Sequence, residues 1–284
     1  MATISASAVK NLREITGVAM MDCKKALVET NGDLNAAQDY LRKKGQAKAL
    51  KKSTRETREG AVFFSTSDDG KSASLVKVGC ETDFVARNKI FKEFIKKLAM
   101  QICEKGNDNL LDQHLISGDG NVQNFLTNSI AELGENIQII NSRKIEIKNG
   151  TFGGYIHSNG KIGVLVPLET SDPCDDMRLK SLAHNIAMHI AASHAEAVKS
   201  EQVQSEVLEK EKEIFKAQAK ESGKPENIIE KMIDGRIKKF LKDVCVESQP
   251  FVKDPLITVG KLVENTSNEI GVKIDFNTFE KYQF

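Results

Sequence analysis

An internal repeat constrains the fold of this 284-residue chain more than any other feature. Each copy contains two strand-like segments separated by a polar turn, followed by an apolar helix segment at Leu98–Ile102 or at Ile186–Ile190. The strand-like segments are 60–64 and 71–78 in the first copy and 154–157 and 161–168 in the second. Strand, hairpin, strand and helix, repeated twice, predict an α+β fold whose core has two pseudo-symmetric subdomains.

Helical and basic segments surround this core, and the pattern divides the chain into six predicted units. These are a three-helix docking module (1–46), a basic linker (47–59), the first core subdomain (60–147), the first part of the second (148–199), an antiparallel coiled-coil hairpin (200–245) and the return to the second core subdomain (246–284). Asp33 is a good N-cap for the third helix of the module, and Gly45 is expected to end that helix. A last strand is predicted over 270–276.

The hairpin prediction rests on a change of composition after residue 200. Apolar residues become sparse over 201–244, and Ser222-Gly223-Lys224-Pro225 interrupts the run in the middle. Two charged helices with narrow apolar seams and a tight turn predict an antiparallel coiled coil. Its apolar edge is too thin to form a core, so we expect the hairpin to project from the body and to contact something.

Charge and cysteine content exclude several classes of protein. The chain has 41 basic and 40 acidic residues, a balance that argues against a protein that wraps nucleic acid. Its five cysteines include no C-x-x-C pair, so reduced thiols are expected rather than a disulfide framework or a zinc ribbon. No long apolar segment predicts a membrane span, and no signal peptide is recognisable, so a cytoplasmic location is expected.

Motifs for nucleotide or metal chemistry are not found. Asp69-Gly70-Lys71-Ser72 resembles the end of a phosphate loop, but Ser65 stands where that motif needs glycine, and Asp-Gly is a hairpin turn signal. His184, His189 and His194 are spaced by five, which does not make a helical ligand pair. A cysteine nucleophile with a histidine partner is an alternative that the sequence leaves open, although no local motif supports it. We therefore expect no enzyme, no cofactor, no metal site and no direct nucleotide binding.

The most unusual local stretch is Thr82-Asp83-Phe84-Val85, between a predicted buried strand and a strongly amphipathic helix. In that helix Phe91, Phe94 and Leu98 are spaced by three and four, which places them on one face. An acid followed by two apolar side chains is unusual in a surface connection. One interpretation is structural, because Phe84 precedes Phe91 by seven residues and could share its helix face. The other interpretation is a tip that contacts a partner. The residue types alone leave both open.

Several motifs, in order along the chain, resemble the bacterial elongation factor Ts family. They are Leu12-Arg13-Glu14, Thr16-Gly17, the run Met20 to Leu27, Thr82-Asp83-Phe84-Val85, the run Lys161 to Val166, the run His184 to Ser193, Ser222-Gly223-Lys224-Pro225 and Gln249-Pro250-Phe251-Val252. The resemblance spans nearly the whole chain. It implies a guanine-nucleotide exchange factor that binds elongation factor Tu with bound GDP and promotes GDP release during translation.

The resemblance also implies which residues contact the partner. The three-helix module, similar to ubiquitin-associated domains, would dock on the GTPase through Arg13, Met20, Met21 and Lys24. Thr82, Asp83, Phe84 and Val85 would reach its nucleotide domain, and His157 in the second core subdomain would meet another domain. The coiled coil is implicated in self-association, hence a homodimer, in some members. Many members carry a further C-terminal helix that also touches the GTPase, whereas this sequence stops at Phe284, shortly after the last predicted strand. A contact from that element is therefore in doubt here.

Two alternatives remain at this stage. The first is a scaffold or adaptor that uses the coiled coil, and it leaves the Asp83-Phe84 pair unexplained. The second is a ribosome-associated RNA-binding factor that uses the lysine-rich linker, which the balanced charge makes weaker. We expect no direct contact with nucleic acid and none with a membrane.

Overall fold

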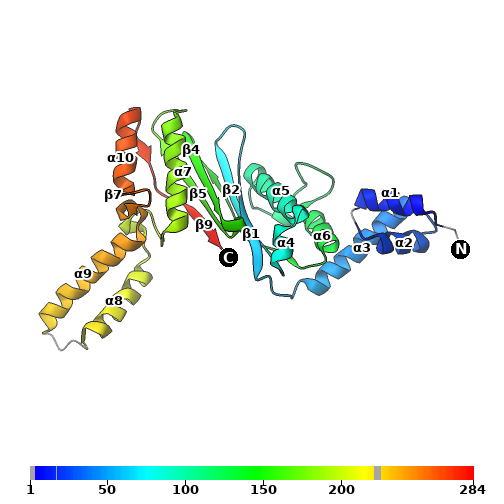
Figure 1. The fold of residues 1–284 in the computed structure, drawn as a ribbon, viewed down its shortest axis with the longest axis horizontal. Helices are drawn as coiled ribbons and strands as arrows, with labels where there is room; N and C mark the ends of the chain where they lie inside the picture. The colour runs from blue at the N-terminus through cyan, green and yellow to red at the C-terminus, as the bar shows by residue number, and fades with distance from the viewer. Residues whose placement is uncertain (1–3, 17, 221–224) are drawn as a thin grey trace.

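The computed structural model describes residues 4–16, 18–220 and 225–284, which form an elongated molecule (Figure 1). The α-helices are α1 (Ala6–Thr16), α2 (Met20–Glu29), α3 (Leu34–Lys52), α4 (Asp83–Arg87), α5 (Lys89–Lys105), α6 (Val122–Leu133), α7 (Met177–Ala192), α8 (Ser205–Lys220), α9 (Glu226–Val244) and α10 (Val259–Ile270). The strands are β1 (Glu59–Thr66), β2 (Ser72–Cys80), β3 (Ile137–Glu146), β4 (Gly150–His157), β5 (Ile162–Thr170), β6 (Pro250–Phe251), β7 (Asp254–Thr258), β8 (Ile274–Asp275) and β9 (Glu280–Gln283). Mixed helices and sheets confirm the α+β class.

The first half of the core is an antiparallel sheet in the order β1-β2-β3 with helices on its outer face. Helix α5 lies on β1 and β2 and buries the apolar face predicted from its spacing, including Phe91, Phe94 and Leu98. Helix α6 packs beside α5. A register shift between Lys77 and Val78 marks a bulge where β2 pairs with β3.

The second half of the core is a sheet in the order β4-β5-β8, with β9 also paired to β5. Helix α7 covers this sheet through the buried side chains of Leu179, Leu182 and Ile186, and α10 packs on α7. The predicted order of strand, hairpin, strand and helix is therefore present in both halves, as β1-β2-α5 and as β4-β5-α7.

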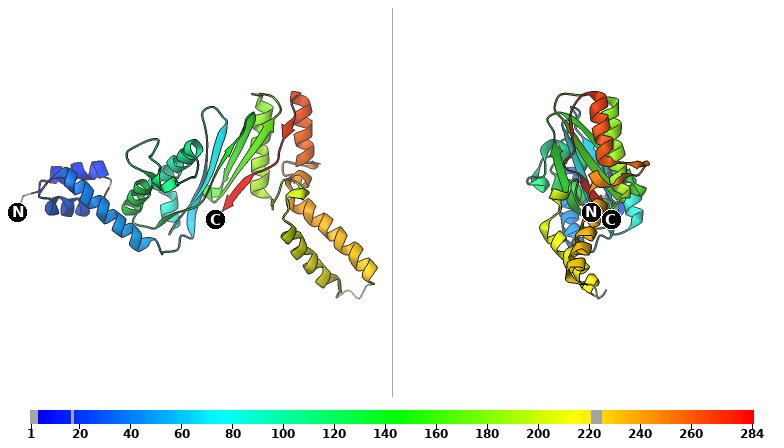
Figure 2. Two further views of the ribbon diagram at one scale, coloured as in Figure 1. Left: turned by 180° about the vertical axis from the view of Figure 1, so that it is seen from behind. Right: turned by 90° about the vertical axis from the view of Figure 1, so that its left-hand side faces the viewer.

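The two sheets face each other, and the helices lie outside them (Figure 2). Val62, Leu75 and Leu165 are buried between the sheets. Gly154 on β4 has no side chain where the Phe64 ring lies, since a Cβ there would fall 2.2 Å from Phe64 Cζ. The close approach of the sheets therefore depends on glycine at this position.

The N-terminal module packs α1, α2 and α3 around a small apolar centre that includes Leu12 and Leu27. Asp22 on α2 is paired with two lysines of α3, at 3.1 Å from Lys44 Nζ and 2.8 Å from Lys48 Nζ. As predicted, Asp33 caps α3: its Oδ1 accepts hydrogen bonds from Asn35 N at 2.9 Å and Ala36 N at 3.0 Å.

The prediction that Gly45 ends this helix is wrong, because α3 continues to Lys52 and includes the first part of the predicted linker. Gly45 is buried against α6, where a Cβ would lie 3.7 Å from Ala131 Cβ. A glycine inside a helix costs only about 1 kcal/mol, and the residues after it are good helix formers. Packing against α6 therefore carries the helix through the glycine and joins the module to the core.

Helices α8 and α9 lie side by side and project from the second half (Figure 1). Arg236 on α9 crosses to α8, where it donates to Gln218 and lies 5.5 Å from the Phe215 ring centroid. Of the turn predicted at Ser222-Gly223-Lys224-Pro225, only Pro225 is among the described residues, and it is the N-cap of α9.

The strand predicted over 270–276 is wrong in extent. Helix α10 runs to Ile270, and only Ile274–Asp275 pairs, as β8. The sequence prediction also missed β9, which pairs with β5 from Ile162↔Gln283 to Leu165↔Glu280. Its polar sequence carries little strand signal of its own, and it is held as a strand by a partner far away in the chain.

Candidate functional site

The stretch Thr82–Val85 forms a corner between β2 and α5 rather than a plain loop. Strand β2 ends at Cys80, and Asp83–Arg87 makes the five-residue helix α4 before α5 begins at Lys89. Thr82 is the N-cap of α4, and its Oγ1 accepts a hydrogen bond from Val85 N at 3.4 Å. Helix α4 therefore starts at a fixed point on the rim of the first sheet.

The corner presents an acid and an aromatic ring to solvent. Phe84 is 82% exposed, whereas Phe91 is fully buried, so the interpretation of Phe84 as a plug under α5 is wrong. Asp83 is partly exposed and forms an ion pair with Arg87 one turn later, at 3.1 Å between Oδ2 and Nη2. A large apolar side chain this exposed, next to a carboxylate, is suited to contact a partner surface.

Thr82 and Val85 have inward roles. Val85 is 8% exposed and packs in the apolar core of the first half. Thr82 Oγ1 donates a hydrogen bond to Glu135 Oε1 at 2.6 Å. The structure thus divides the predicted group: Asp83 and Phe84 face outward, and Thr82 and Val85 hold them.

Glu135 belongs to none of the motifs recognised in the sequence. It follows Gly134, the αL residue that ends α6, and comes before β3. Gly134 is of a residue type that commonly ends helices, but this local signal does not specify where the next side chain points.

The predicted contact residues of the N-terminal module are all exposed. Arg13 lies in the last turn of α1, and Met20, Met21 and Lys24 lie on α2. The exposed fractions of Met20 and Met21 are 42% and 74%. Ile15, which was not among the predicted contact residues, is also exposed on the last turn of α1. Exposed methionines adapt their shape to an apolar partner.

His157 lies at the end of β4 in the second half of the core. Its side chain is exposed, and Nδ1 lies 2.9 Å from the hydroxyl of Tyr155. The Tyr155 ring also meets His184 edge-on, at 6.0 Å between centroids. These three rings form a polar aromatic patch on β4 and α7 that the sequence had suggested only at His157.

The three groups of predicted contact residues do not meet in one cavity. The module, the α4 corner and His157 belong to successive parts of an elongated molecule (Figure 1). Separated contact groups of this kind suit a long interface with a macromolecule, whereas a small-molecule site gathers its polar groups in one concave pocket.

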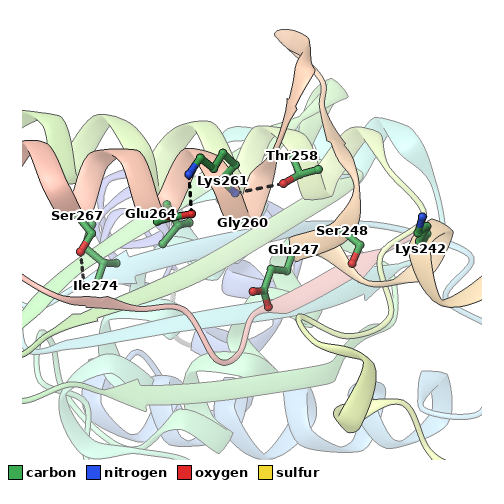
Figure 3. A pocket seen from close by; sticks show the side chains of 10 residues that line it. Lys242, Glu247, Ser248, Thr258, Gly260, Lys261, Glu264, Ser267 and Ile274 are labelled. Atoms are coloured by element: carbon green, nitrogen blue, oxygen red, sulfur yellow. Dashed lines mark hydrogen bonds and ion pairs between the residues drawn. The ribbon is translucent and has the colours of Figure 1, made fainter. Parts of the chain in front are cut away.

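A hollow of about 760 Å³ lies on the second half of the core, between α10 and the segment that follows α9 (Figure 3). Lys261 pairs with Glu264 at 2.9 Å, and Lys261 N donates to Thr258 Oγ1 at 3.2 Å. Glu247 adds a second carboxylate to the lining. The lining holds two carboxylates, Glu247 and Glu264, and two lysines, Lys242 and Lys261, and Lys261 is paired with Glu264. The negative charge of the two carboxylates makes the hollow a poor site for a phosphate.

The four buried cysteines are not arranged for nucleophilic chemistry. Cys23, Cys80, Cys103 and Cys245 are buried. Burial raises the pKa of the Cys80 thiol to about 12, and the carboxylates of Glu135 and Glu59 add to the shift. A thiol nucleophile needs the opposite shift. In the ranges that the structure describes, no group of three or more His, Cys, Asp or Glu side chains is placed to hold a metal ion.

A search for membrane-spanning helices in the described part of the chain finds none of sufficient length and apolar character.

Comparisons with known proteins agree on one family. The sequence profile of the family described as Elongation factor TS matches residues 81–283. Elongation factor Ts of Lawsonia intracellularis is 44% identical over 99% of this chain and 98% of its own length. The protein of the same name from Clostridium acetobutylicum is 44% identical over 99% of this chain and 92% of its own, and that of Desulfovibrio desulfuricans is 42% identical over 100% and 99%.

Proposed function

The chain belongs to the elongation factor Ts family, and we infer from this membership that it is a guanine-nucleotide exchange factor. It binds elongation factor Tu with bound GDP and promotes the release of GDP in translation elongation, in the cytoplasm where ribosomes work. No chemical reaction is catalysed by the chain itself. The adaptor and RNA-binding alternatives are not favoured, because neither gives the exposed Phe84 a role.

The observation that carries the site assignment is the corner at α4. Phe84 is 82% exposed while its neighbour Val85 is buried, so the ring is held out from a rigid base. In a GTPase, Mg²⁺ requires near-octahedral oxygen ligands and bridges the nucleotide phosphates to the protein, so a small displacement of that frame weakens nucleotide binding. Asp83 and Phe84 would contact the partner near this frame, with Phe84 entering an apolar gap as a wedge.

The wedge alone cannot expel the nucleotide. Burying one phenylalanine contributes roughly 1.5–3 kcal/mol. A nucleotide bound with nanomolar affinity is held by about 12 kcal/mol. Coupling between two ligands is reciprocal, so the factor weakens nucleotide binding by as much as the nucleotide weakens binding of the factor. The free energy must therefore come from a longer interface, and the corner directs it to the nucleotide site.

Two further contact groups supply that interface in this proposal. The N-terminal module docks through Arg13, Met20, Met21 and Lys24, all exposed on α1 and α2. His157, exposed at the end of β4, contacts a second domain of the partner. The continuous helix α3 supports the module's role, because it fixes the distance between these contacts and the corner.

The α8–α9 hairpin is a separate proposed interface. Ile214 and Ile228 are 40% and 42% exposed on it, so apolar surface remains after the two helices have packed together. Self-association of two copies through this hairpin stays a prediction, which sedimentation of the whole protein over a range of concentrations would test.

The experiment that tests the function is release of a fluorescent GDP analogue from purified elongation factor Tu, followed by stopped flow. Addition of this protein should accelerate release in a saturable way. Release that stays at the intrinsic rate at every concentration of the protein would contradict the proposed function.

A further inference from the structure

The turn between α6 and β3 lies directly against the α4 corner. Gly134 ends α6 in the left-handed region, with φ of 78° and ψ of 4°, a conformation that glycine adopts without steric cost. Helix α6 therefore stops there, and the next two residues, Glu135 and Asn136, come before β3. Glu135 is half-buried and Asn136 is buried, so both side chains point into the protein.

The Glu135 carboxylate is the acceptor for three groups of the corner. Oε2 accepts hydrogen bonds from the backbone N–H of Glu81 at 3.1 Å and of Thr82 at 3.0 Å. Oε1 accepts the hydroxyl proton of Thr82 at 2.6 Å. Hydrogen bonds to a charged acceptor are shorter and stronger than those between neutral groups, so this carboxylate fixes the backbone at the point where β2 gives way to α4.

Thr82 transmits this constraint to the helix that carries the aromatic ring. Because its hydroxyl proton is given to Glu135, an oxygen lone pair is left for Val85 N, which lies 3.4 Å away. Helix α4 has five residues, and a helix this short is not stable without a cap and tertiary anchors. Phe84 itself is 82% exposed and has little packing of its own, so its direction is set by the start of α4.

The other half of the same turn reaches the segment that follows α3. Asn136 N donates to Glu81 Oε1 at 2.7 Å, and Asn136 Nδ2 donates to the Arg55 carbonyl at 2.8 Å. Arg55 Nη1 also lies 3.4 Å from Glu81 Oε1. The turn therefore braces the corner on one side and the base of the module's long helix on the other.

We propose that Glu135 is a positioning residue for nucleotide exchange, acting through Thr82 and the backbone of Glu81 to hold Phe84 at the angle that the partner requires. This inference rests on the proposed function of the corner. Glu135 does not itself have to touch the GTPase or its nucleotide. Removal of its carboxylate should leave the affinity for the GTPase nearly unchanged and should lower the maximal rate of nucleotide release.

Three variants separate this role from a general effect on stability. Glu135→Ala removes the acceptor of all three hydrogen bonds and leaves the backbone N–H groups of Glu81 and Thr82 without their partner. Glu135→Gln retains a carbonyl oxygen for the backbone N–H groups, while its amide can donate to the Thr82 hydroxyl oxygen, so most of the geometry is kept. Glu132→Ala is the matched control, because it removes an exposed carboxylate from the last turn of α6, three residues before Glu135.

The measurement is the rate of GDP-analogue release from elongation factor Tu over a range of factor concentrations. For Glu135→Ala we expect the maximal release rate to fall about fivefold or more, with a change of less than about twofold in the half-saturating concentration, since misplacement of a positioned group costs rate. Glu135→Gln should recover most of the rate, and Glu132→Ala should match the wild type. Equal maximal rates for Glu135→Ala and the wild type would overturn the inference.

A second readout does not depend on exchange activity. Hydrogen exchange of the free protein should show faster exchange at the amides of Glu81, Thr82 and Val85 in Glu135→Ala, with amides of α5 unchanged. Thr82→Val should give a similar loss of rate, and the double variant should lose little more, because both changes break one pathway. Fully additive losses would overturn the inference. A wild-type protein that fails to accelerate release contradicts the proposed function, whereas unchanged protection at the corner contradicts only the role of Glu135.

Discussion

Phe84 and Val85 are neighbours on α4, yet Phe84 is 82% exposed and Val85 is 8% exposed. One turn of a short helix thus has an outward ring directly joined to an inward anchor. Phe84 is therefore placed to contact a partner while Val85 anchors the helix, and a substitution at each position tests one of these roles alone.

The first prediction concerns this pair. Phe84→Ala should reduce the maximal rate of GDP release several-fold and leave the melting temperature of the protein unchanged, because an exposed side chain contributes little to folding stability. Val85→Ala should lower the free energy of unfolding by about 1–2 kcal/mol, since it removes buried methyl groups. Stopped-flow release and thermal unfolding of both variants give the answer. Unchanged release by Phe84→Ala would exclude the wedge.

The second prediction concerns docking of the N-terminal module. Replacing Met20 and Met21 together by alanine should weaken binding to elongation factor Tu by about tenfold, because truncation of central apolar contacts commonly costs more than 1 kcal/mol. The maximal release rate should stay near that of the wild type. Val28→Ala is a suitable control, because Val28 is 48% exposed near the other end of α2. Titration calorimetry measures the binding, and equal affinities for the double variant and the control would refute the docking role.

The third prediction is a pH dependence that arises at His189. This side chain is buried, its Nδ1 accepts the Val252 N–H at 3.2 Å, and its Nε2 therefore carries the proton and donates to Gln249 Oε1 at 2.8 Å. Burial lowers the pKa of His189 below the ordinary 6.5, and the hydrogen bond with Gln249 opposes this only in part. The unfolded chain then binds a proton that the folded protein does not, so stability is full above about pH 6.5 and falls as the pH drops below it.

Urea unfolding between about pH 7.5 and pH 5 measures the size of this loss. His189→Gln should be less stable at neutral pH and should lose less stability on acidification than the wild type does. His194→Gln, at an exposed histidine, is the control and should follow the wild-type curve. Parallel curves for His189→Gln and the wild type would show that the pH dependence has another source.

The fourth prediction compares two glycines. Gly154→Ala should lower the free energy of unfolding by about 1–3 kcal/mol, because its Cβ would overlap the Phe64 ring between the two sheets. Gly235→Ala should raise it by up to about 1 kcal/mol, because that glycine lies inside α9 with open space around it. Phe64→Leu should relieve part of the cost of Gly154→Ala. Thermal unfolding of the variants measures these effects, and a Gly154→Ala variant as stable as the wild type would mean that the sheets can move apart.

The spacing of apolar residues in the sequence predicted those helices and strands that need only a single neighbouring surface to pack against. The spacing of Phe91, Phe94 and Leu98 was sufficient for α5, because one helix face meets one sheet. Two features depend on distant partners and could not be predicted. Gly45 stays helical because α6 packs against it, and the polar strand β9 exists because β5 binds it.

The candidate site divides in the same way. The residue types of Asp83 and Phe84 marked the corner as unusual, and the family resemblance gave it a role. Glu135 lies far along the chain and is brought to Thr82 only by the return of the chain from α6 to β3. No periodicity or motif in the sequence specifies that meeting.

The pairing of β9 with β5 has a consequence for how the chain folds as it is made. All three strands of the first sheet lie within residues 59–146, so that sheet can close early in synthesis. Strand β5 can pair with β9 only after α7, the α8–α9 hairpin and α10 have all been synthesised. Contacts of such long range form slowly. The half that carries Phe84 is therefore expected to fold first and to serve as a finished surface on which the second half assembles.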